Sequence, residues 1–119
     1  MINQRQQILN LLGLARRAGQ LVTGEGMVLT ALQKDQVRIV LLASDAGQAT
    51  IKKVTDKCQT HQVRVVNDFT RLEISQAIGQ ARTIVGITGA GFAKKIHQLT
   101  TKLNDGELAY GQRKNLRIS

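Results

Sequence analysis

The first third of the chain alternates helical and extended patterns of apolar residues. Apolar positions within residues 8–15 follow the i, i+3, i+4, i+7 spacing of an amphipathic helix. Gly19 follows where a C-terminal cap is expected. Residues 21–22 are a short extended piece, and residues 25–34 again place their apolar side chains on one helical face. The pattern therefore predicts helix, short strand and helix in this order.

Three runs of aliphatic residues predict strands farther along the chain. Residues 38–43 are almost continuously apolar, which is typical of a strand buried on both faces. Residues 63–66 and 83–87 are the other two runs. After the first run, Ser44 and Asp45 are expected to cap the next helix.

Two more helices complete the pattern. Thr70 and Glu73 have the spacing of a capping box, which predicts a helix start between the second and third strand runs. The final helix is expected to start near Gly91 and to continue to Leu103. No period is visible from Asn104 onward, which predicts a polar tail.

The alternation of strands and helices predicts an α/β protein. It indicates a single-domain three-layer α/β/α sandwich with a central sheet of about four strands covered on both faces. Residues 1–103 are expected to form this domain, and residues 104–119 a basic, partly disordered tail.

Two short segments share the pattern Thr-Gly-x-Gly, at residues 23–26 and 88–91. Each lies where an apolar run ends and a helical pattern begins. The first turn of a helix has free backbone N–H groups and the positive end of the helix dipole, so each segment is a candidate anion-binding site. The alternative is a tight strand-to-helix turn without a ligand. A phosphate-binding P-loop is excluded, because Phe92 and Ala93 stand where that loop needs Lys and Ser or Thr.

Charge favours a polyanionic partner. The 119 residues include 17 Lys and Arg against 8 Asp and Glu, a formal net charge of +9. The stretch from Arg82 to Lys102 has four cations and no acid. Arg16 and Arg17, at the end of the first helix, either contact the partner or only complement the helix C-terminus. A solvated basic surface is the alternative for the whole pattern.

Aromatic residues are scarce, which limits the kind of nucleic acid that fits. Phe69, Phe92 and Tyr110 are the only three in the sequence, and this counts against a protein that stacks unpaired bases on rings. Folded RNA, recognised by its shape and backbone, is the expected partner. Neither DNA nor a membrane is expected.

The sequence contains no recognisable catalytic set. The single cysteine, Cys58, falls on an apolar helix face and is expected in the core. One cysteine excludes an internal disulfide, and a reducing cytoplasmic location is expected. His61 and His97 lie far apart in the sequence and form no metal-ligand motif. We therefore expect no cofactor, no metal and no enzymatic activity.

Several segments together resemble a known family. Residues 11–19 (LLGLARRAG), 22–25 (VTGE), 41–46 (LLASDA), 55–58 (TDKC) and 91–95 (GFAKK) are similar to the bacterial YlxQ-type proteins. These belong to the kink-turn RNA-binding superfamily of ribosomal proteins. The resemblance covers about residues 4–103 and implies a three-layer fold that binds sharply bent RNA.

The resemblance also implies where RNA binds. In that family the N-terminus of the second helix reads the bent RNA, and a loop before the last helix contacts an extruded nucleotide; these places match the two Thr-Gly-x-Gly segments. Kink-turn binders typically have Gly-x-Asn-Glu at the helix start and a Lys three residues later. Gly24 matches, but Gly26, Met27 and Thr30 stand in the Asn, Glu and Lys positions. The usual base-reading side chains are therefore absent.

These observations predict a non-catalytic, ribosome-associated protein that binds structured RNA, ribosomal RNA in particular. An accessory module that presents RNA to a modifying enzyme, a nucleotide-using enzyme and a protein–protein adaptor are the alternatives. The expected RNA contacts are Arg16, Arg17, Gly24, Glu25, Gly26, Thr88, Gly89, Ala90, Gly91, Phe92, Lys94 and Lys95.

Overall fold

Helices and strands alternate along the chain, as the apolar pattern predicts. The computed structural model describes the backbone of residues 3–110 and the side chains of residues 3–103. The elements, in chain order, are α1 (Gln4–Arg17), β1 (Leu21–Thr23), α2 (Glu25–Gln33), β2 (Ile39–Leu42), α3 (Gln48–Thr60), β3 (Arg64–Val66), α4 (Arg71–Ile78), β4 (Ile84–Ile87) and α5 (Ala90–Tyr110).

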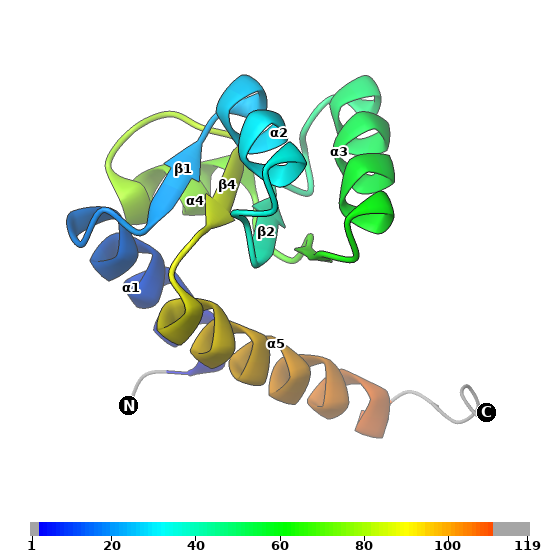
Figure 1. Ribbon diagram of the computed structural model, residues 1–119. Helices are drawn as coiled ribbons and strands as arrows, with labels where there is room; N and C mark the ends of the chain where they lie inside the picture. The colour runs from blue at the N-terminus through cyan, green and yellow to red at the C-terminus, as the bar shows by residue number, and fades with distance from the viewer. Residues whose placement is uncertain (1–2, 111–119) are drawn as a thin grey trace.

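The four strands form one mixed sheet in the order β1-β4-β2-β3. β2 and β3 are parallel, whereas β4 runs antiparallel to both of its neighbours, β1 and β2. Leu21 pairs with Ile87, and Thr23 pairs with Val85. The end of β1 therefore lies beside the start of β4, and the end of β4 lies beside the start of β1. As a result, α2 begins at one end of the sheet and α5 begins at the opposite end (Figure 1).

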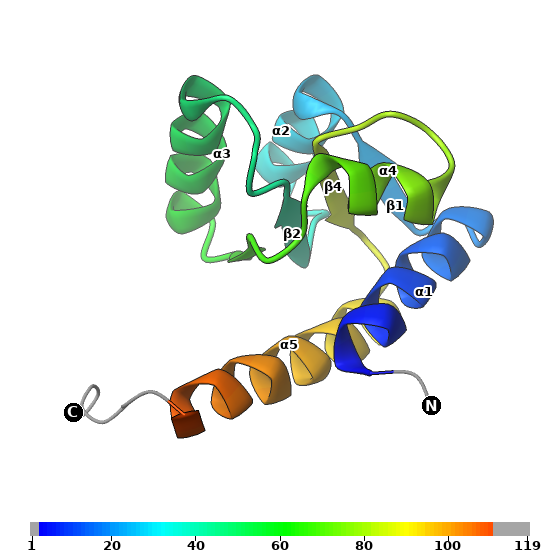
Figure 2. The same ribbon diagram turned by 180° about the vertical axis from the view of Figure 1, so that it is seen from behind.

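Helices cover both faces of the sheet, which confirms the predicted three-layer architecture. On one face lie α1, α4 and α5 (Figure 2), and Ile39, Leu41 and Val85 pack against them. On the other face, Val40 and Ile84 pack against α2 and α3. Successive strand residues alternate between the two apolar clusters because side chains on a strand point alternately to opposite faces. This explains why the strand runs are continuously apolar.

The predicted capping box at the start of α4 is present. Glu73 N donates to Thr70 Oγ1 at 3.2 Å, and Thr70 N donates to Glu73 Oε1 at 2.9 Å. The Glu73 carboxylate also accepts two hydrogen bonds from Arg5 Nη2, at 2.8 and 3.0 Å, and this ion pair joins α1 to α4.

The predicted cap of α3 is wrong. Gly47 is the N-cap residue, and no side chain caps this helix. Asp45 Oδ1 instead accepts a hydrogen bond from Arg71 N, the first residue of α4, at 2.8 Å. Ser44 N donates to Phe69 O at 2.8 Å, which holds the segment after β2 against the segment before α4. This long-range contact places the Asp45 carboxylate at α4 rather than at α3.

The final helix is longer than the sequence pattern predicts. α5 begins at Ala90 and continues to Tyr110, so its predicted end near Leu103 is wrong. The predicted division of the chain at residue 103 falls inside this helix, and residues 111–119 of the expected tail lie outside the described residues. Ile96 and Leu99 are buried as expected, whereas Phe92 is only partly buried.

Candidate nucleic-acid interface

The start of α2 leaves its backbone donors without a side-chain cap. The N-cap residue is Gly24, which has φ +89°, a conformation that favours glycine because it has no Cβ. A Cβ atom built on Gly24 or on Gly26 would meet nothing within 4 Å, so the space beside this helix start is open. The first-turn N–H groups of a helix have no intrahelical acceptor. This helix start is therefore suited to hydrogen bonding with an anion.

Glu25 adds a carboxylate at the same helix start, but its charge is paired. Lys53 Nζ lies 3.0 Å from Glu25 Oε2, and Thr50 Oγ1 donates to Glu25 Oε1 at 3.2 Å. The hydrogen bond from Lys53, and after it that from Thr50, lowers the pKa of Glu25 below its ordinary value. Both partners come from α3. The ion pair fixes α2 against α3 and offsets the negative charge at the helix start.

The loop between α4 and β4 lies directly beside this helix start. Gly24 N donates to Ile84 O at 3.0 Å, and Arg82 Nε donates to Thr23 Oγ1 at 3.2 Å. The backbone of Arg82 exchanges two hydrogen bonds with the Ser75 hydroxyl group, at 3.0 and 3.2 Å, which holds the loop against α4. A cation thus stands beside Gly24 in a fixed position.

Sequence reasoning missed Arg82 as a candidate contact. The residue lies almost 60 positions from Thr23 along the chain. The antiparallel pairing of β1 with β4 brings the two together, and the sequence pattern does not reveal that pairing. In the sequence, Arg82 is marked only by a glycine and a cation shortly before a buried strand. This pattern is too common to identify an RNA contact.

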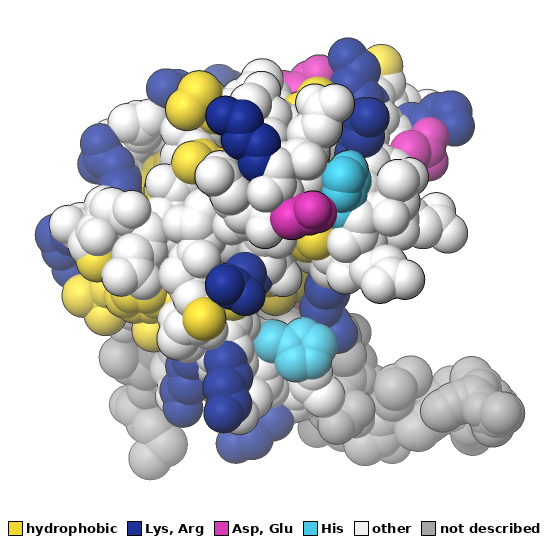
Figure 3. Space-filling view, in the orientation of Figure 1, with side chains coloured by type: hydrophobic (Ala, Val, Ile, Leu, Met, Phe, Trp, Pro, Cys, Tyr) yellow, Lys and Arg dark blue, Asp and Glu magenta, His cyan; other side chains and the backbone are white. Residues whose placement is uncertain are grey.

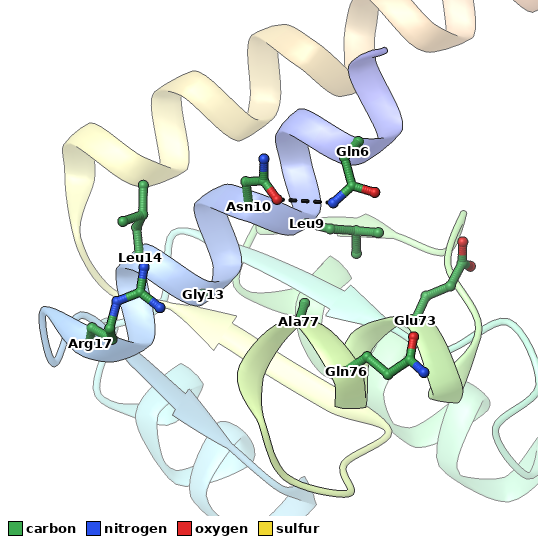
Figure 4. A pocket seen from close by; sticks show the side chains of 9 residues that line it. All are labelled: Gln6, Leu9, Asn10, Gly13, Leu14, Arg17, Glu73, Gln76 and Ala77. Atoms are coloured by element: carbon green, nitrogen blue, oxygen red, sulfur yellow. Dashed lines mark hydrogen bonds between the residues drawn. The ribbon is translucent and has the colours of Figure 1, made fainter. Parts of the chain in front are cut away.

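Arg16 and Arg17 lie on the other side of the same loop. Arg16 Nη1 donates to Ile78 O at 2.7 Å, so Arg16 complements the C-terminus of α4 rather than that of its own helix. Arg17 lines a groove of about 690 Å³ between α1 and α4, with Glu73 at the other end (Figure 4). The start of α2 and the α4–β4 loop therefore form one surface, with Arg82 at the end of the loop and Arg16 bound to the Ile78 carbonyl group where the loop begins. We call it the α2 surface.

The second Thr-Gly-x-Gly segment is built differently. The N–H groups of Thr88 and Gly89 donate to Gln20 O at 3.0 and 3.3 Å. The side chain of Gln20 occupies the space that a Cβ atom on Gly89 would need. A side chain at this position would require the exposed Gln20 side chain to move, and two backbone donors of this segment are already used. Ala90 and Gly91 of this segment are exposed, whereas Thr88 and Gly89 are partly buried.

Exposed cations surround this second segment. Lys94 and Lys95 follow on the first turns of α5 and are exposed, as expected. Arg38, which precedes β2, donates from Nε to Thr88 O at 3.2 Å. Because α2 and α5 begin at opposite ends of the sheet, the structure does not bring the two Thr-Gly-x-Gly segments together (Figure 1). The predicted contacts therefore fall on two separate surfaces.

The titratable groups outside these surfaces have structural surroundings. Cys58 is buried as predicted, and burial raises the pKa of its thiol to about 11, which keeps it protonated and unreactive at neutral pH. His61 Nδ1 lies 3.3 Å from Asp35 Oδ1. Within the described residues, no three His, Cys, Asp or Glu side chains are grouped to hold a metal ion. In the same part of the chain, no helix has the length and apolarity that a membrane span needs.

The sequence matches the model of a known family. The model of the Ribosomal protein L7Ae/L30e/S12e/Gadd45 family matches residues 6–97. The chain belongs to this family, and the resemblance noted in the sequence is thereby confirmed.

Within the family, two relatives carry the same descriptive name. The RNA-binding protein YlxQ of Enterococcus faecium is 43% identical over 95 residues, which cover 80% of this chain and 92% of the relative. The RNA-binding protein YlxQ of Bacillus subtilis (strain 168) is 41% identical over 90 residues, which cover 75% and 90%.

Solved structures have the same fold. A Bacillus halodurans protein with unknown function superposes with a TM-score of 0.76 at 45% identity, covering 79% of this chain and 96% of that one. The Giardia lamblia 15.5kD RNA binding protein superposes with a TM-score of 0.73 at 14% identity, covering 86% and 88%. The second similarity, at this low identity, concerns the fold alone.

Proposed function

We propose that this protein binds structured RNA through the α2 surface. The observation that carries the proposal is the uncapped, open start of α2 with Arg82 fixed beside it. Backbone N–H groups and guanidinium groups are the donors that proteins direct at phosphate oxygens. The names of the relatives, which are RNA-binding proteins, support the same partner.

The chemistry of the surface suits a bent RNA backbone more than a base sequence. Gly26 has no side chain, and Met27, 63% exposed, offers a thioether and no strong hydrogen-bonding group. Phosphate contacts position an RNA without reading its sequence. We therefore assign backbone docking to residues 24–26 and phosphate neutralisation to Arg16, Arg17 and Arg82.

The role that fits these contacts is non-catalytic. The protein holds a bent segment of ribosomal RNA in the cytoplasm, as part of or in association with the ribosome. Kink-turn RNA is the bent form that the family resemblance suggests.

The test is a charge change at the helix start. Gly26→Glu adds an acid in open space in the first turn, where a carboxylate favours the helix. We expect affinity for a bent hairpin RNA to fall about tenfold, ~1.4 kcal/mol, because the carboxylate repels phosphate. The melting temperature should not fall.

Two controls accompany this test. Gly26→Ala should keep wild-type affinity, because the methyl group meets no neighbour. Gln59→Glu makes the same charge change at an exposed position in the last turn of α3 and should leave affinity within about twofold, the range of a weak surface effect. Equal losses in Gly26→Glu and Gln59→Glu, measured by fluorescence anisotropy, contradict the proposal.

A further inference from the structure

Two stretches of the chain that pack against each other contain no acidic residue. The sequence has no Asp or Glu before Glu25, and none between Glu73 and Asp105. α1 and the first turns of α5 lie in these two stretches and pack side by side. The side chains over this part of α5 in Figure 3 include Lys, Arg and His but no Asp or Glu.

Three cations lie on or next to the start of α5, and we call them the α5 cation cluster: Arg38, Lys94 and Lys95. All three are exposed, and none forms an ion pair with a carboxylate in the part of the chain that the structure describes. The Thr88 carbonyl group accepts from Arg38 Nε at 3.2 Å and so orients its guanidinium group. Cations that are not paired with a carboxylate and are held on rigid elements create an electrostatic field that attracts a polyanion.

We infer that the α5 cation cluster binds the phosphate backbone of a second RNA segment, a double-stranded one. The inference rests on the proposed function, in which the α2 surface holds the first segment. The cluster can bind phosphate through the charges of its side chains. The backbone N–H groups of Thr88 and Gly89 do not contribute, because they already donate to the Gln20 carbonyl group. Lysine ammonium groups act on phosphate as point charges, so this contact is independent of sequence.

The position of the cluster makes it a second site rather than an extension of the first. The α2 surface and the α5 cation cluster lie at opposite ends of β4 (Figure 1). α2 and α5 also pack on opposite faces of the sheet. The two sites therefore face different ends of the sheet. Occupation of both sites joins two RNA segments through one protein molecule.

The first experiment measures salt dependence. The logarithm of the binding constant for a plain RNA duplex falls with the logarithm of salt concentration by about 0.9 for each phosphate contact in a duplex. The double variant Lys94→Gln with Lys95→Gln should reduce that slope by about 1.8. The control, Lys52→Gln with Lys57→Gln, removes two exposed lysines from α3, of which Lys52 pairs with Asp56, and should leave the slope unchanged. Melting temperatures of both variants show whether folding is intact.

The second experiment detects joining of two RNAs. When the protein is saturated with a labelled bent hairpin, an immobilised duplex should retain that hairpin through the protein. The Lys94→Gln, Lys95→Gln variant should still bind the hairpin but should not be retained on the duplex. Equal slopes for the two lysine pairs, or no capture by the wild type, overturn the inference. Stronger lysine-dependent binding to polyglutamate or to phosphatidylserine vesicles than to duplex RNA also overturns it.

The same data separate the two proposals. Hairpin binding that is sensitive to Gly26→Glu but occurs without duplex capture leaves the proposed function in place and removes only the second site. A wild-type protein that binds neither RNA at low salt removes both.

Discussion

Gly24 and Gly89 occupy the same position in two copies of one four-residue motif, yet their surroundings differ. Gly24 has φ +89° and open space beside it, whereas the side chain of Gln20 covers Gly89. The sequence shows that both glycines precede a helix, which the structure confirms. It does not show what packs against each, because Gln20 faces Gly89 only through the pairing of β1 with β4.

Three positions in the first turns of α2 should determine how well the protein distinguishes bases. Gly26, Met27 and Thr30 lack the hydrogen-bonding groups found at these positions in typical kink-turn binders. A good bidentate base contact contributes roughly 1–3 kcal/mol of discrimination. We expect the wild type to prefer a kink-turn over the same RNA with Watson–Crick pairs in place of its G·A pairs by less than ~100-fold, about 2.7 kcal/mol.

Restoring the three side chains should raise that preference. The triple variant Gly26→Asn, Met27→Glu, Thr30→Lys provides the missing groups at exposed or open positions, so the fold should tolerate it. The kink-turn preference should increase by at least tenfold, roughly one bidentate contact. Competition binding with the two RNAs measures it. A wild-type preference above ~100-fold, or no gain in the triple variant, contradicts this account of the helix start.

At the scale of elements, the sequence correctly predicted features that depend on residues close together in the chain. The capping box of Thr70 and Glu73 is correct because both partners lie within one turn. The cap of α3 is wrong because Asp45 bonds to the distant backbone of Arg71. The loop carrying Arg82 joins the candidate site only through strand pairing. The continuation of α5 to Tyr110 also escaped the pattern, because no apolar period marks it.

The capping box gives α4 a dependence on pH. The pKa of Glu73 is lowered, first by the hydrogen bond from the Thr70 backbone and also by Arg5. A carboxylate whose folded pKa is depressed stabilises the fold above its unfolded pKa, and this contribution is lost as the pH falls through the folded value. The melting temperature should therefore drop as the pH falls below about 4.5, the ordinary value.

A neutral replacement isolates this contribution. Glu73→Gln can still fill the third position of a capping box but cannot ionise. The variant should be less stable than the wild type at pH 7, and the difference in melting temperature should shrink in acid. Glu25→Gln is a useful comparison. The pKa of Glu25 is also lowered, but Glu25 lies at the start of α2 and not in the capping box of α4. A Glu73→Gln deficit that stays constant across the acid range contradicts the assignment.

At the scale of the whole molecule, the antiparallel arrangement of β4 determines where the two candidate binding surfaces lie. It places the α2 surface, with its open backbone donors, at one end of the sheet and the α5 cation cluster at the other. The net charge of +9 predicts attraction to RNA but not where RNA binds. The sheet between the two surfaces is a packed core, so both are held on rigid elements.

The central claim is that structured RNA docks on the α2 surface, and backbone amide chemical shifts test it most directly. A bent hairpin RNA is added in small steps to ¹⁵N-labelled protein, so that the tighter site fills first. The largest changes should fall on residues 24–27 and on the α4–β4 loop around Arg82, with smaller changes later at Lys94 and Lys95. Early changes confined to other elements, with residues 24–27 unaffected at saturation, contradict the account.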